Sequence, residues 1–370
     1  MHRAGRSVFV SLARLAYRWG ARPLIFRGDA QRAHESVVDL FGRLDAYPAL
    51  MRALHTLAYA PMPVTVGGVT LESPLMLAAG FVKGHGFPDE VAALDAVTRG
   101  LNIMPGHMSA PALFGAVEFG SFTRWPRMGN SGRVIWRDAA TRSTQNRVGL
   151  KNPGAKAAAA FLASRPLPSM FGVNIAVSPG VSDVTLEQTE AVEALQAFTE
   201  AGVRPSWFTL NVSCPNTEDD PQGHHTRERT RGLTEALRAQ VGDTPLWVKV
   251  SPGLDPSQYA ILMRVFADAD VKAVIATNTI GQPTPDDSQV SAGVGGGRLH
   301  AHPVKAAALL MDEKRRHGYN VDVIGCGGIM AAPSYNDFAR VGVTVGQYWS
   351  ALIYEGLFAA AQLALELESH

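Results

Sequence analysis

The segment with the densest set of chemically capable side chains is LNVSCPNT, residues 210–217. It places the thiol of Cys214 between the neutral amides of Asn211 and Asn216 in the sequence. A cysteine has an ordinary pKa of about 8.5, and its thiolate can accept a proton. Amides donate and accept hydrogen bonds without charge, which suits an uncharged planar cyclic amide better than a phosphate. The segment therefore predicts a proton acceptor beside a binding site for such a ring.

Two lysines stand where predicted strands end. Lys83 follows LAAGF and Lys249 lies within WVKVS, so either could place a fixed positive charge beside a reduced flavin or a substrate carboxylate. A lysine inside an apolar strand is seldom there for packing alone, which favours a functional role for Lys249. For Lys83, which lies in a glycine-rich loop, simple solvent exposure is the alternative.

Two glycine-rich turns near the end of the chain are typical of a phosphate site. GCGGIM spans residues 325–330, and GQYWSAL spans residues 346–352 and opens a helix. Glycine lets backbone N–H groups approach a phosphate closely, and the start of a helix adds favourable dipoles. The two turns follow the last two predicted strands, which is where barrels of strands and helices usually bind phosphate.

The remaining cysteine and the histidines carry weaker signals. We expect Cys326 to be a small buried apolar residue, as most free cysteines are. His224 and His225 lie in a polar loop, and no paired-cysteine or HExxH motif accompanies them. We therefore expect no metal site.

These side chains need a fold with many short buried strands. Eight apolar runs with flanking Gly, Pro or Asn occur, and helix-compatible stretches separate most of them. This alternation predicts an α/β protein, a (β/α)8 TIM barrel with an N-terminal helical extension; an open doubly wound sheet is the alternative. The barrel is favoured because polar residues and glycines follow nearly every strand, at the end where barrels place their active sites. The predicted strands are 75–77, 115–121, 170–176, 206–212, 245–251, 271–278, 321–327 and 343–349, and the predicted helices include 186–201, 234–241, 256–269 and 303–317.

Composition excludes several classes of protein. The chain has 370 residues, 46% of them hydrophobic and 18% charged, which is too apolar for a disordered protein. Its formal net charge of +1 disfavours a general nucleic-acid binder. Two cysteines exclude a disulfide scaffold and favour a reducing compartment. No apolar stretch is long enough to predict a helix that spans a bilayer.

The N-terminal segment differs from the rest. Residues 1–27 carry six arginines and no acidic side chain. Apolar residues recur there at helical spacing, with arginines and serines on another face, and this pattern predicts an amphipathic basic helix. Such a helix suits the surface of an anionic membrane, whereas an ordinary helix packed on the following domain is the alternative. The apolar positions are Val8, Leu12, Leu15 and Trp19. A second helical pattern runs from about residue 29 to residue 59, with a break at Pro48.

Ten motifs, in the same order along nearly the whole chain, resemble those of the dihydroorotate dehydrogenase family. The resemblance implies a (β/α)8 barrel that contains FMN. The motifs are LAAGFVK (77–83), GAVEFGSFT (115–123), QNRVGLKN (145–152), GVNI (172–175), LNVSCPNT (210–217), WVKVSP (247–252), ATNT (276–279), GGGR (295–298), VIGCGGI (323–329) and QYWSALIYEG (347–356).

The start of the chain is similar to one branch of that family. The basic helices followed by RPLIFRGDAQRAHE (22–35) resemble the membrane-associated, quinone-reducing class 2 enzymes. The resemblance implies that residues 1–60 form a membrane-associating segment with a hydrophobic tunnel toward the flavin. Residues 61–370 would then form the FMN-binding catalytic barrel. It also implies peripheral attachment at the cytoplasmic face of a membrane.

The resemblance also implies roles for individual residues. Cys214 matches the catalytic base, which takes a proton from C5 of dihydroorotate as hydride leaves C6 for flavin N5. Orotate, for pyrimidine synthesis, is the product, and a membrane quinone is the oxidant. The implied substrate contacts are Lys83, Asn146, Asn211, Asn216, Asn278 and Thr279. The implied FMN contacts are Ala79, Gly80, Lys83, Ser121, Asn174, Asn211, Lys249, Thr277, Gly297, Gly328, Trp349 and Ser350.

Some features depart from the class 2 pattern. Class 2 enzymes usually carry serine as the base, whereas cysteine is typical of the soluble class 1 branch. Val82 replaces an acidic residue, Leu150 replaces an aromatic residue near the substrate, and GVNI lacks its usual Gly-Lys-Asn continuation. Extra residues lie between Lys83 and Gly115, and the loop 218–232 is long and charged. A related flavoprotein that acts on another reduced pyrimidine or cyclic amide is therefore the alternative. A flavin-binding barrel without turnover is disfavoured by the intact base and amides.

Overall fold

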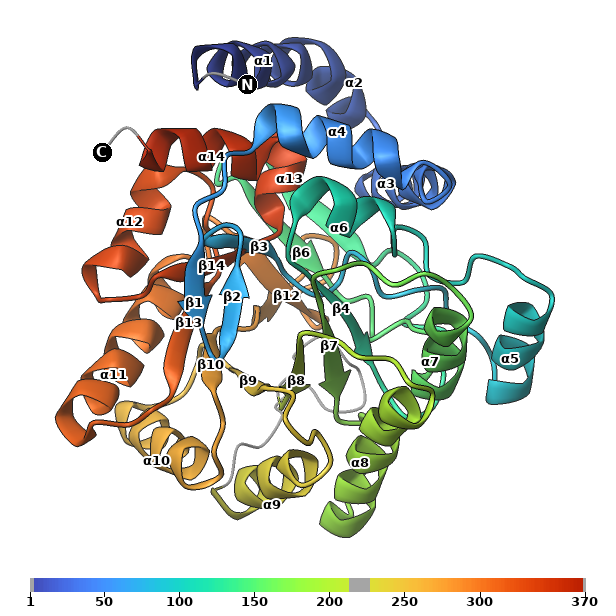
Figure 1. Ribbon diagram of the computed structural model, residues 1–370, viewed down its shortest axis with the longest axis vertical. Coiled ribbons are helices and arrows are strands. Elements are labelled where there is room, and N and C mark those ends of the chain that lie inside the picture. Colours follow the sequence, from blue (N-terminus) through green and yellow to red (C-terminus); the bar gives the residue numbers. More distant parts are fainter. Residues whose placement is uncertain (1–2, 213–226, 369–370) are drawn as a thin grey trace.

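A closed barrel of eight parallel strands forms the centre of the molecule (Figure 1). The structure, a computed structural model, describes residues 3–212 and 227–368. The last strand pairs with the first, with Gly346 beside Leu75, so the sheet closes on itself. This confirms the predicted barrel and excludes the open sheet. In chain order the barrel strands are β3 (Leu75–Leu77), β4 (Val117–Phe122), β7 (Phe171–Ala176), β8 (Trp207–Asn211), β9 (Leu246–Val250), β10 (Ala273–Ala276), β13 (Asp322–Cys326) and β14 (Val345–Tyr348).

Helices surround the barrel and explain why its strands are so apolar. Every residue of β7, β8 and β9 is buried, because helices cover the outer face and side chains fill the interior. All eight predicted strands are present, and the four predicted outer helices are confirmed to within a few residues, except that α9 begins earlier than expected. The helices after β3 are α5 (Glu90–Thr98), α6 (Ser109–Phe114), α7 (Ala155–Ala163), α8 (Val184–Glu200), α9 (Arg227–Arg238), α10 (Pro256–Asp268), α11 (Ala301–His317), α12 (Ala332–Arg340), α13 (Ser350–Glu355) and α14 (Ala359–Leu367).

A hairpin packs against the N-terminal end of the barrel. Its strands are β1 (Val64–Val66) and β2 (Val69–Leu71). The indole N–H of Trp247 donates to the Gly67 carbonyl at 3.0 Å, and the ring of Trp247 stacks on that of Trp207 with centroids 4.6 Å apart. Because this end is filled by packed side chains, a site has room at the opposite, C-terminal end.

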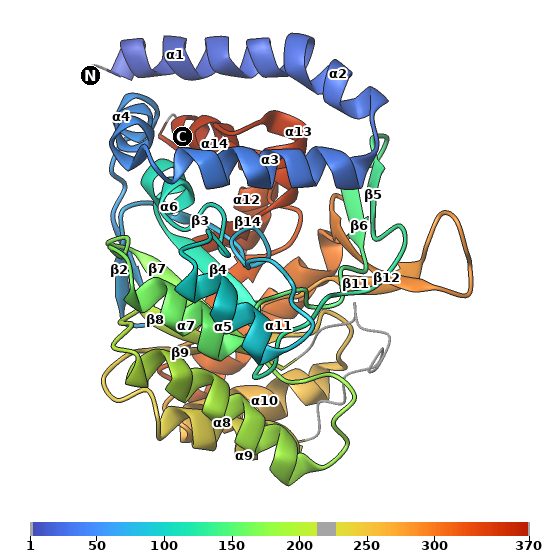
Figure 2. The same ribbon diagram turned by 90° about the vertical axis from the view of Figure 1, so that its right-hand side faces the viewer.

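A second sheet, which the sequence did not predict, lies at the C-terminal end of the barrel. Its four antiparallel strands follow the order β11-β12-β6-β5, and Figure 2 shows them projecting beside the barrel. Two come from the loop after β4 and two from the loop after β10, so two distant segments build one surface. The strands are β5 (Ile135–Asp138), β6 (Ser143–Asn146), β11 (Ile280–Pro283) and β12 (Ser291–Gly296).

The N-terminal helices form a layer across one end of the molecule (Figure 2). The predicted break at Pro48 is confirmed, because Pro48 begins a new helix. The amphipathic helix predicted within residues 1–27 is present: it begins at Arg3 and continues into a π-helical turn, Tyr17–Ala21. The α-helices are α1 (Arg3–Ala16), α2 (Arg22–Arg27), α3 (Ala30–Leu44) and α4 (Pro48–Ala58).

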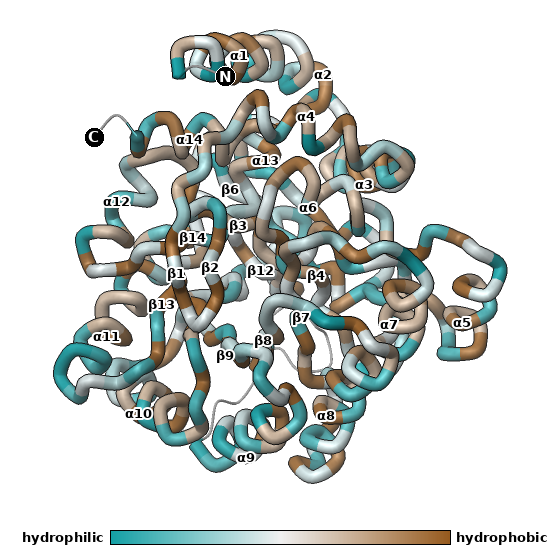
Figure 3. Tube along the Cα trace, viewed as in Figure 1, coloured by the Kyte–Doolittle hydropathy of each residue, from teal (hydrophilic) through white to brown (hydrophobic). Residues whose placement is uncertain are grey.

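The apolar face identified on α1 and on the π-helical turn that follows it points away from the barrel. Its four apolar side chains are each more than half exposed, and apolar and polar residues alternate along the helix in Figure 3. A different strip faces inward, where Val10 is fully buried and the Phe9 ring meets Phe358 edge-on at 5.3 Å. Arginines also face inward, since Arg14 Nε lies 3.0 Å from Glu355. The exposed strip comprises Val8, Leu12, Leu15 and Trp19.

The insertion between Lys83 and Gly115 fastens the N-terminal helices to the barrel. Asp45, just after α3, accepts hydrogen bonds from the backbone N–H groups of Gly106, Met108 and Ser109 at 2.8 to 3.0 Å. Its carboxylate also accepts from the Asn102 amide at 2.9 Å and the Ser109 hydroxyl. Burial opposes ionisation, but hydrogen bonds from His107, Ser109 and Asn102 prevail and lower the pKa of Asp45. One carboxylate thus joins the end of α3 to the start of α6.

Candidate active site

One pocket opens at the C-terminal end of the barrel, and all eight strands contribute to it. Each strand, or the residue just after it, places at least one residue in the lining, which confirms that this end of the barrel carries the chemically capable residues. In strand order these residues are Ala78, Ser121, Asn174, Asn211, Lys249, Thr277, Cys326 and Gln347.

Amide and hydroxyl groups from three barrel strands meet on one side of the pocket. The Asn278 amide donates to Oδ1 of Asn211 at 3.1 Å, and the Asn211 amide lies 3.3 Å from the Ser121 hydroxyl. The backbone N–H of Thr279 donates to Oδ1 of Asn278 at 2.9 Å. These bonds fix the rotation of both asparagine side chains. A planar ring with its own amide groups would find oriented donors and acceptors here.

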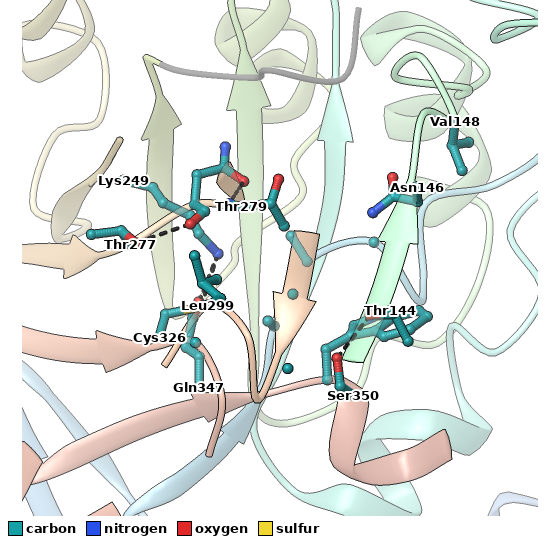
Figure 4. A pocket seen from close by; sticks show the side chains of 18 of the residues that line it. Thr144, Asn146, Val148, Lys249, Thr277, Thr279, Leu299, Cys326, Gln347 and Ser350 are labelled. Atoms are coloured by element: carbon teal, nitrogen blue, oxygen red, sulfur yellow. Dashed lines mark hydrogen bonds between the residues drawn. The ribbon is translucent and has the colours of Figure 1, made fainter. Parts of the chain in front are cut away.

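Lys249 occupies the floor of the pocket. Its ammonium lies 3.0 Å from Oε1 of Gln347 and 3.4 Å from the sulfur of Cys326 (Figure 4). Burial raises the pKa of the Cys326 thiol, although the Lys249 charge opposes this shift. Cys326 is therefore a neutral thiol at physiological pH, buried as the sequence suggested but lining the pocket as well.

The unpredicted sheet supplies the opposite wall. Figure 4 shows Thr144, Asn146 and Val148 on this wall, across from Lys249 and Thr279. The Thr144 hydroxyl lies 2.9 Å from the hydroxyl of Ser350, which begins α13. Asn146 therefore reaches the pocket from a sheet, not from a barrel strand.

The loop after β13 passes very close to neighbouring backbone. Gly328 has a φ of 71°, and a Cβ there would lie 2.6 Å from the Cβ of His300 and 2.9 Å from the Gly296 carbonyl oxygen. A larger residue would have to displace one of these segments. Glycine is thus required for the loop to line the pocket beside Ser350.

The pocket is electrostatically positive. Lys83 and Lys249 line it, and no carboxylate side chain does so among the residues that the structure describes. The pocket therefore favours a ligand with at least one anionic group, such as a phosphate or a carboxylate.

His34 of α3 lines the pocket and was not singled out by sequence reasoning. Its ring centroid lies 5.8 Å from that of Trp349. Burial, with smaller contributions from the charges of Lys83 and Lys151, lowers its pKa to about 3. His34 is therefore neutral at physiological pH. Residues 29–59 were predicted to be helical, but nothing in that pattern distinguishes His34 from an ordinary surface histidine.

Most of the predicted site residues that fall in the described part of the chain line this one pocket. Gly297 does not line the pocket, whereas its neighbours Gly295 and Gly296 do. Cys214 and Asn216 lie outside the described residues. The predicted residues in the lining are Ala79, Gly80, Lys83, Ser121, Asn146, Asn174, Asn211, Lys249, Thr277, Asn278, Thr279, Gly328, Trp349 and Ser350.

Comparison with known proteins agrees with the motifs. The family model for dihydroorotate dehydrogenase matches residues 62–370. A protein of Sphingopyxis alaskensis named "Dihydroorotate dehydrogenase (quinone)" is 30% identical over 98% of this chain and 95% of its own length. A protein of the same name from Salinispora arenicola is 32% identical over 90% of this chain and 94% of its own.

A solved structure shares the fold. The dihydroorotate dehydrogenase of Eimeria tenella in complex with ferulenol matches with a TM-score of 0.71, at 21% identity, over 92% of this chain and 90% of that one. Taken with the barrel and its pocket, these matches show that the chain belongs to the dihydroorotate dehydrogenase family, in its quinone type.

Proposed function

We propose that this protein oxidises dihydroorotate to orotate with bound FMN, for pyrimidine synthesis, and passes the electrons to a membrane quinone. The observation that carries the proposal is the pocket itself. It brings oriented amides and two ammonium groups together, with no carboxylate among its described lining residues. Dihydroorotate is a cyclic amide with one carboxylate, so its chemistry matches that lining.

The residues present fit FMN. Asn174 is completely buried in the pocket lining, yet neither polar atom of its side chain has a hydrogen-bond partner within the described chain. A buried amide without a partner costs free energy, which a bound ligand would recover. Lys249 and Asn174 would hold the flavin ring, and the loop with Gly328 and Ser350 would hold its phosphate. When bound, FMN supplies the acceptor for hydride.

The substrate would lie between the amide side and the sheet wall. Lys83 would bind the carboxylate, and Asn146, Asn211 and Asn278 would hold the ring flat, with Thr279 and Asn216 adding polar contacts. Cys214, three positions after Asn211 in the sequence, would accept the proton from C5.

The N-terminal helices, residues 1–60, would bind the membrane surface and admit the quinone. Nine of the sixteen large apolar side chains that are exposed in the described structure belong to α1 through α4 and the residues between them. No helix in the ranges 3–212 and 227–368 is long and apolar enough to cross a bilayer. The exposed apolar side chains of this layer support peripheral attachment, which we place at the cytoplasmic face by analogy with the class 2 enzymes. His34 is the contact between this layer and the pocket of the barrel, residues 61–370.

Anaerobic reduction of the purified protein tests the proposal. The protein in mild detergent should show the absorbance of bound FMN, and dihydroorotate should bleach it. A quinone should then restore the yellow band, while fumarate should not. Protein without flavin contradicts the proposal, as does reoxidation by fumarate instead of quinone.

A different substrate is the second candidate, and Leu150 favours it. Leu150 lines the pocket with a φ of 52°, and its carbonyl accepts from the Asn152 amide at 2.6 Å. The flat face that an aromatic ring would offer to a substrate is absent at this position. If FMN stays oxidised with dihydroorotate but is bleached by another reduced pyrimidine, this second candidate is correct.

A further inference from the structure

A buried chain of hydrogen bonds runs from the pocket into the barrel interior. Gln347 accepts from Lys249 through Oε1 at 3.0 Å, and its Nε2 donates to Oε2 of Glu118 at 3.2 Å. The other carboxylate oxygen of Glu118 accepts from the Trp207 indole at 3.3 Å and from the Thr209 hydroxyl. None of these five residues is more than 6% exposed. The chain links a positive charge at the pocket to a negative charge beneath it.

The carboxylate of Glu118 dictates how Gln347 is oriented. An ionised carboxylate can only accept hydrogen bonds, so Gln347 must turn its NH2 group toward Glu118. The carbonyl oxygen of Gln347 must then face Lys249, and it gives the ammonium a fixed acceptor. Buried charge pairs add little net stability compared with apolar packing, so stability alone gives no reason for a carboxylate at this position.

We propose that Glu118 is a positioning residue for the flavin: it holds Lys249 in place through Gln347, offsets part of its charge, and so lowers the reduction potential of bound FMN. The inference rests on the proposed function, because it requires FMN beside Lys249. A flavin that has accepted a hydride gains negative charge, which an ammonium group stabilises and a carboxylate destabilises. Water and salt screen buried charges poorly, so the field of Glu118 reaches the pocket.

The substitution Glu118→Gln tests this directly, because it removes the charge and keeps the shape. The midpoint potential of bound FMN, measured by anaerobic titration with a reference dye, should rise above that of the wild type. Glu187→Gln is the matched control, since Glu187 is also buried and pairs with Arg229, but on the outer helix α8. That variant should keep the wild-type potential.

The outcomes separate the inference from the proposed function. Wild-type protein without FMN contradicts the proposed function. FMN that is present in Glu118→Gln with an unchanged or lower potential overturns the inference alone. If Glu118→Gln does not fold, Gln347→Leu replaces it, because it removes the link between Glu118 and Lys249 and leaves both charges in place. The ammonium then loses the acceptor that holds it at the pocket and can approach Glu118, so the midpoint potential of bound FMN should fall below that of the wild type. A potential at or above the wild-type value overturns the inference.

Discussion

At the level of single residues, two lysines and one neutral histidine set the charge of the pocket. Lys83 and Lys249 line it, while His34 is held neutral beside them by burial. A neutral imidazole avoids adding a third positive charge at the point where α3 meets the barrel. The described lining therefore offers a ligand two ammonium groups whose surroundings are mostly amides and hydroxyls.

Removal of the proposed base should slow one half-reaction without loss of the cofactor. We expect Cys214→Ala to retain FMN and to reduce the rate of flavin reduction by dihydroorotate by about 10²–10⁴-fold, as is typical for loss of a general base. In Cys214→Ser, the rate of flavin reduction should continue to increase up to a higher pH than in the wild type. The reason is that a hydroxyl ionises less readily than a thiol. Anaerobic stopped-flow absorbance measures both rates. Unchanged reduction in Cys214→Ala would exclude this residue as the base.

The depressed pKa of His34 predicts how stability depends on pH. Between pH 6.5 and about 3 the unfolded chain binds a proton at His34 that the folded chain does not. The contribution of neutral His34 to the free energy of unfolding is therefore fully present above pH 6.5. It is lost as the pH falls, by up to about 1.4 kcal/mol per pH unit. Urea unfolding at pH 5.5 and 4.5 measures this loss of stability. The His34→Gln variant should not show it, whereas the control His302→Gln, at an exposed site, should show it as the wild type does. Parallel pH dependences for His34→Gln and the wild type would show that His34 is protonated in the folded state.

At the level of secondary-structure elements, the apolar runs predicted the barrel strands but not the second sheet. The segments VIGC of β13 and WFTLN of β8 are buried on both sides, so apolar residues mark them. The strands STQN and IGQP have no such run, and β6 pairs with β12, which follows it by more than a hundred residues. That pairing depends on tertiary contacts that no local pattern contains.

The same limit applies to the site. Asn211 and Asn278 follow apolar strands, so their positions at the pocket could be predicted. Thr144 and His34 come from a polar strand and a surface helix, where polar residues are ordinary. Glu118 did carry a signal, since a carboxylate within GAVEFGS is as unusual as the lysine within WVKVS.

Loss of the Asp45 carboxylate should loosen the N-terminal layer. Asp45→Ala leaves several buried donors without an acceptor, and we expect the free energy of unfolding in urea to fall by about 3 kcal/mol. Asp89→Ala, which removes only the exposed cap of α5, should cost about 1 kcal/mol. Equal losses for the two variants would mean that Asp45 acts as an ordinary helix cap.

At the level of the whole molecule, the exposed apolar side chains gather at one end. The arginines of α1 do not simply add to this surface, because Arg14 pairs with Glu355, and Arg3 and Arg6 pair with Glu368. Attachment to a membrane should therefore depend on apolar insertion more than on attraction to anionic lipids.

Polar substitution of the exposed strip should separate the two half-reactions. We expect the combined variant Val8→Gln, Leu12→Gln, Leu15→Gln and Trp19→Gln to fold normally and to reduce its flavin with dihydroorotate at the wild-type rate. Flotation with lipid vesicles and reduction of a membrane-embedded quinone should both fall at least tenfold. Leu186→Gln with Ile261→Gln, two exposed apolar sites on barrel helices, is the control and should bind vesicles like the wild type. Normal flotation of the combined variant would exclude this strip as the membrane contact.

The pairing of the first helix with the end of the chain affects the order in which the protein is assembled. Arg14 of α1 meets Glu355, and Phe9 meets Phe358, so these inner partners of α1 are synthesised long after α1 itself. At about 5–20 residues per second, synthesis of the 341 residues from Arg14 to Glu355 takes roughly 17–68 s. During that interval the inner face of α1 lacks these partners, while its outer strip is exposed in any case. The ribosome therefore presents an amphipathic helix to nearby membranes before the barrel that it serves has closed.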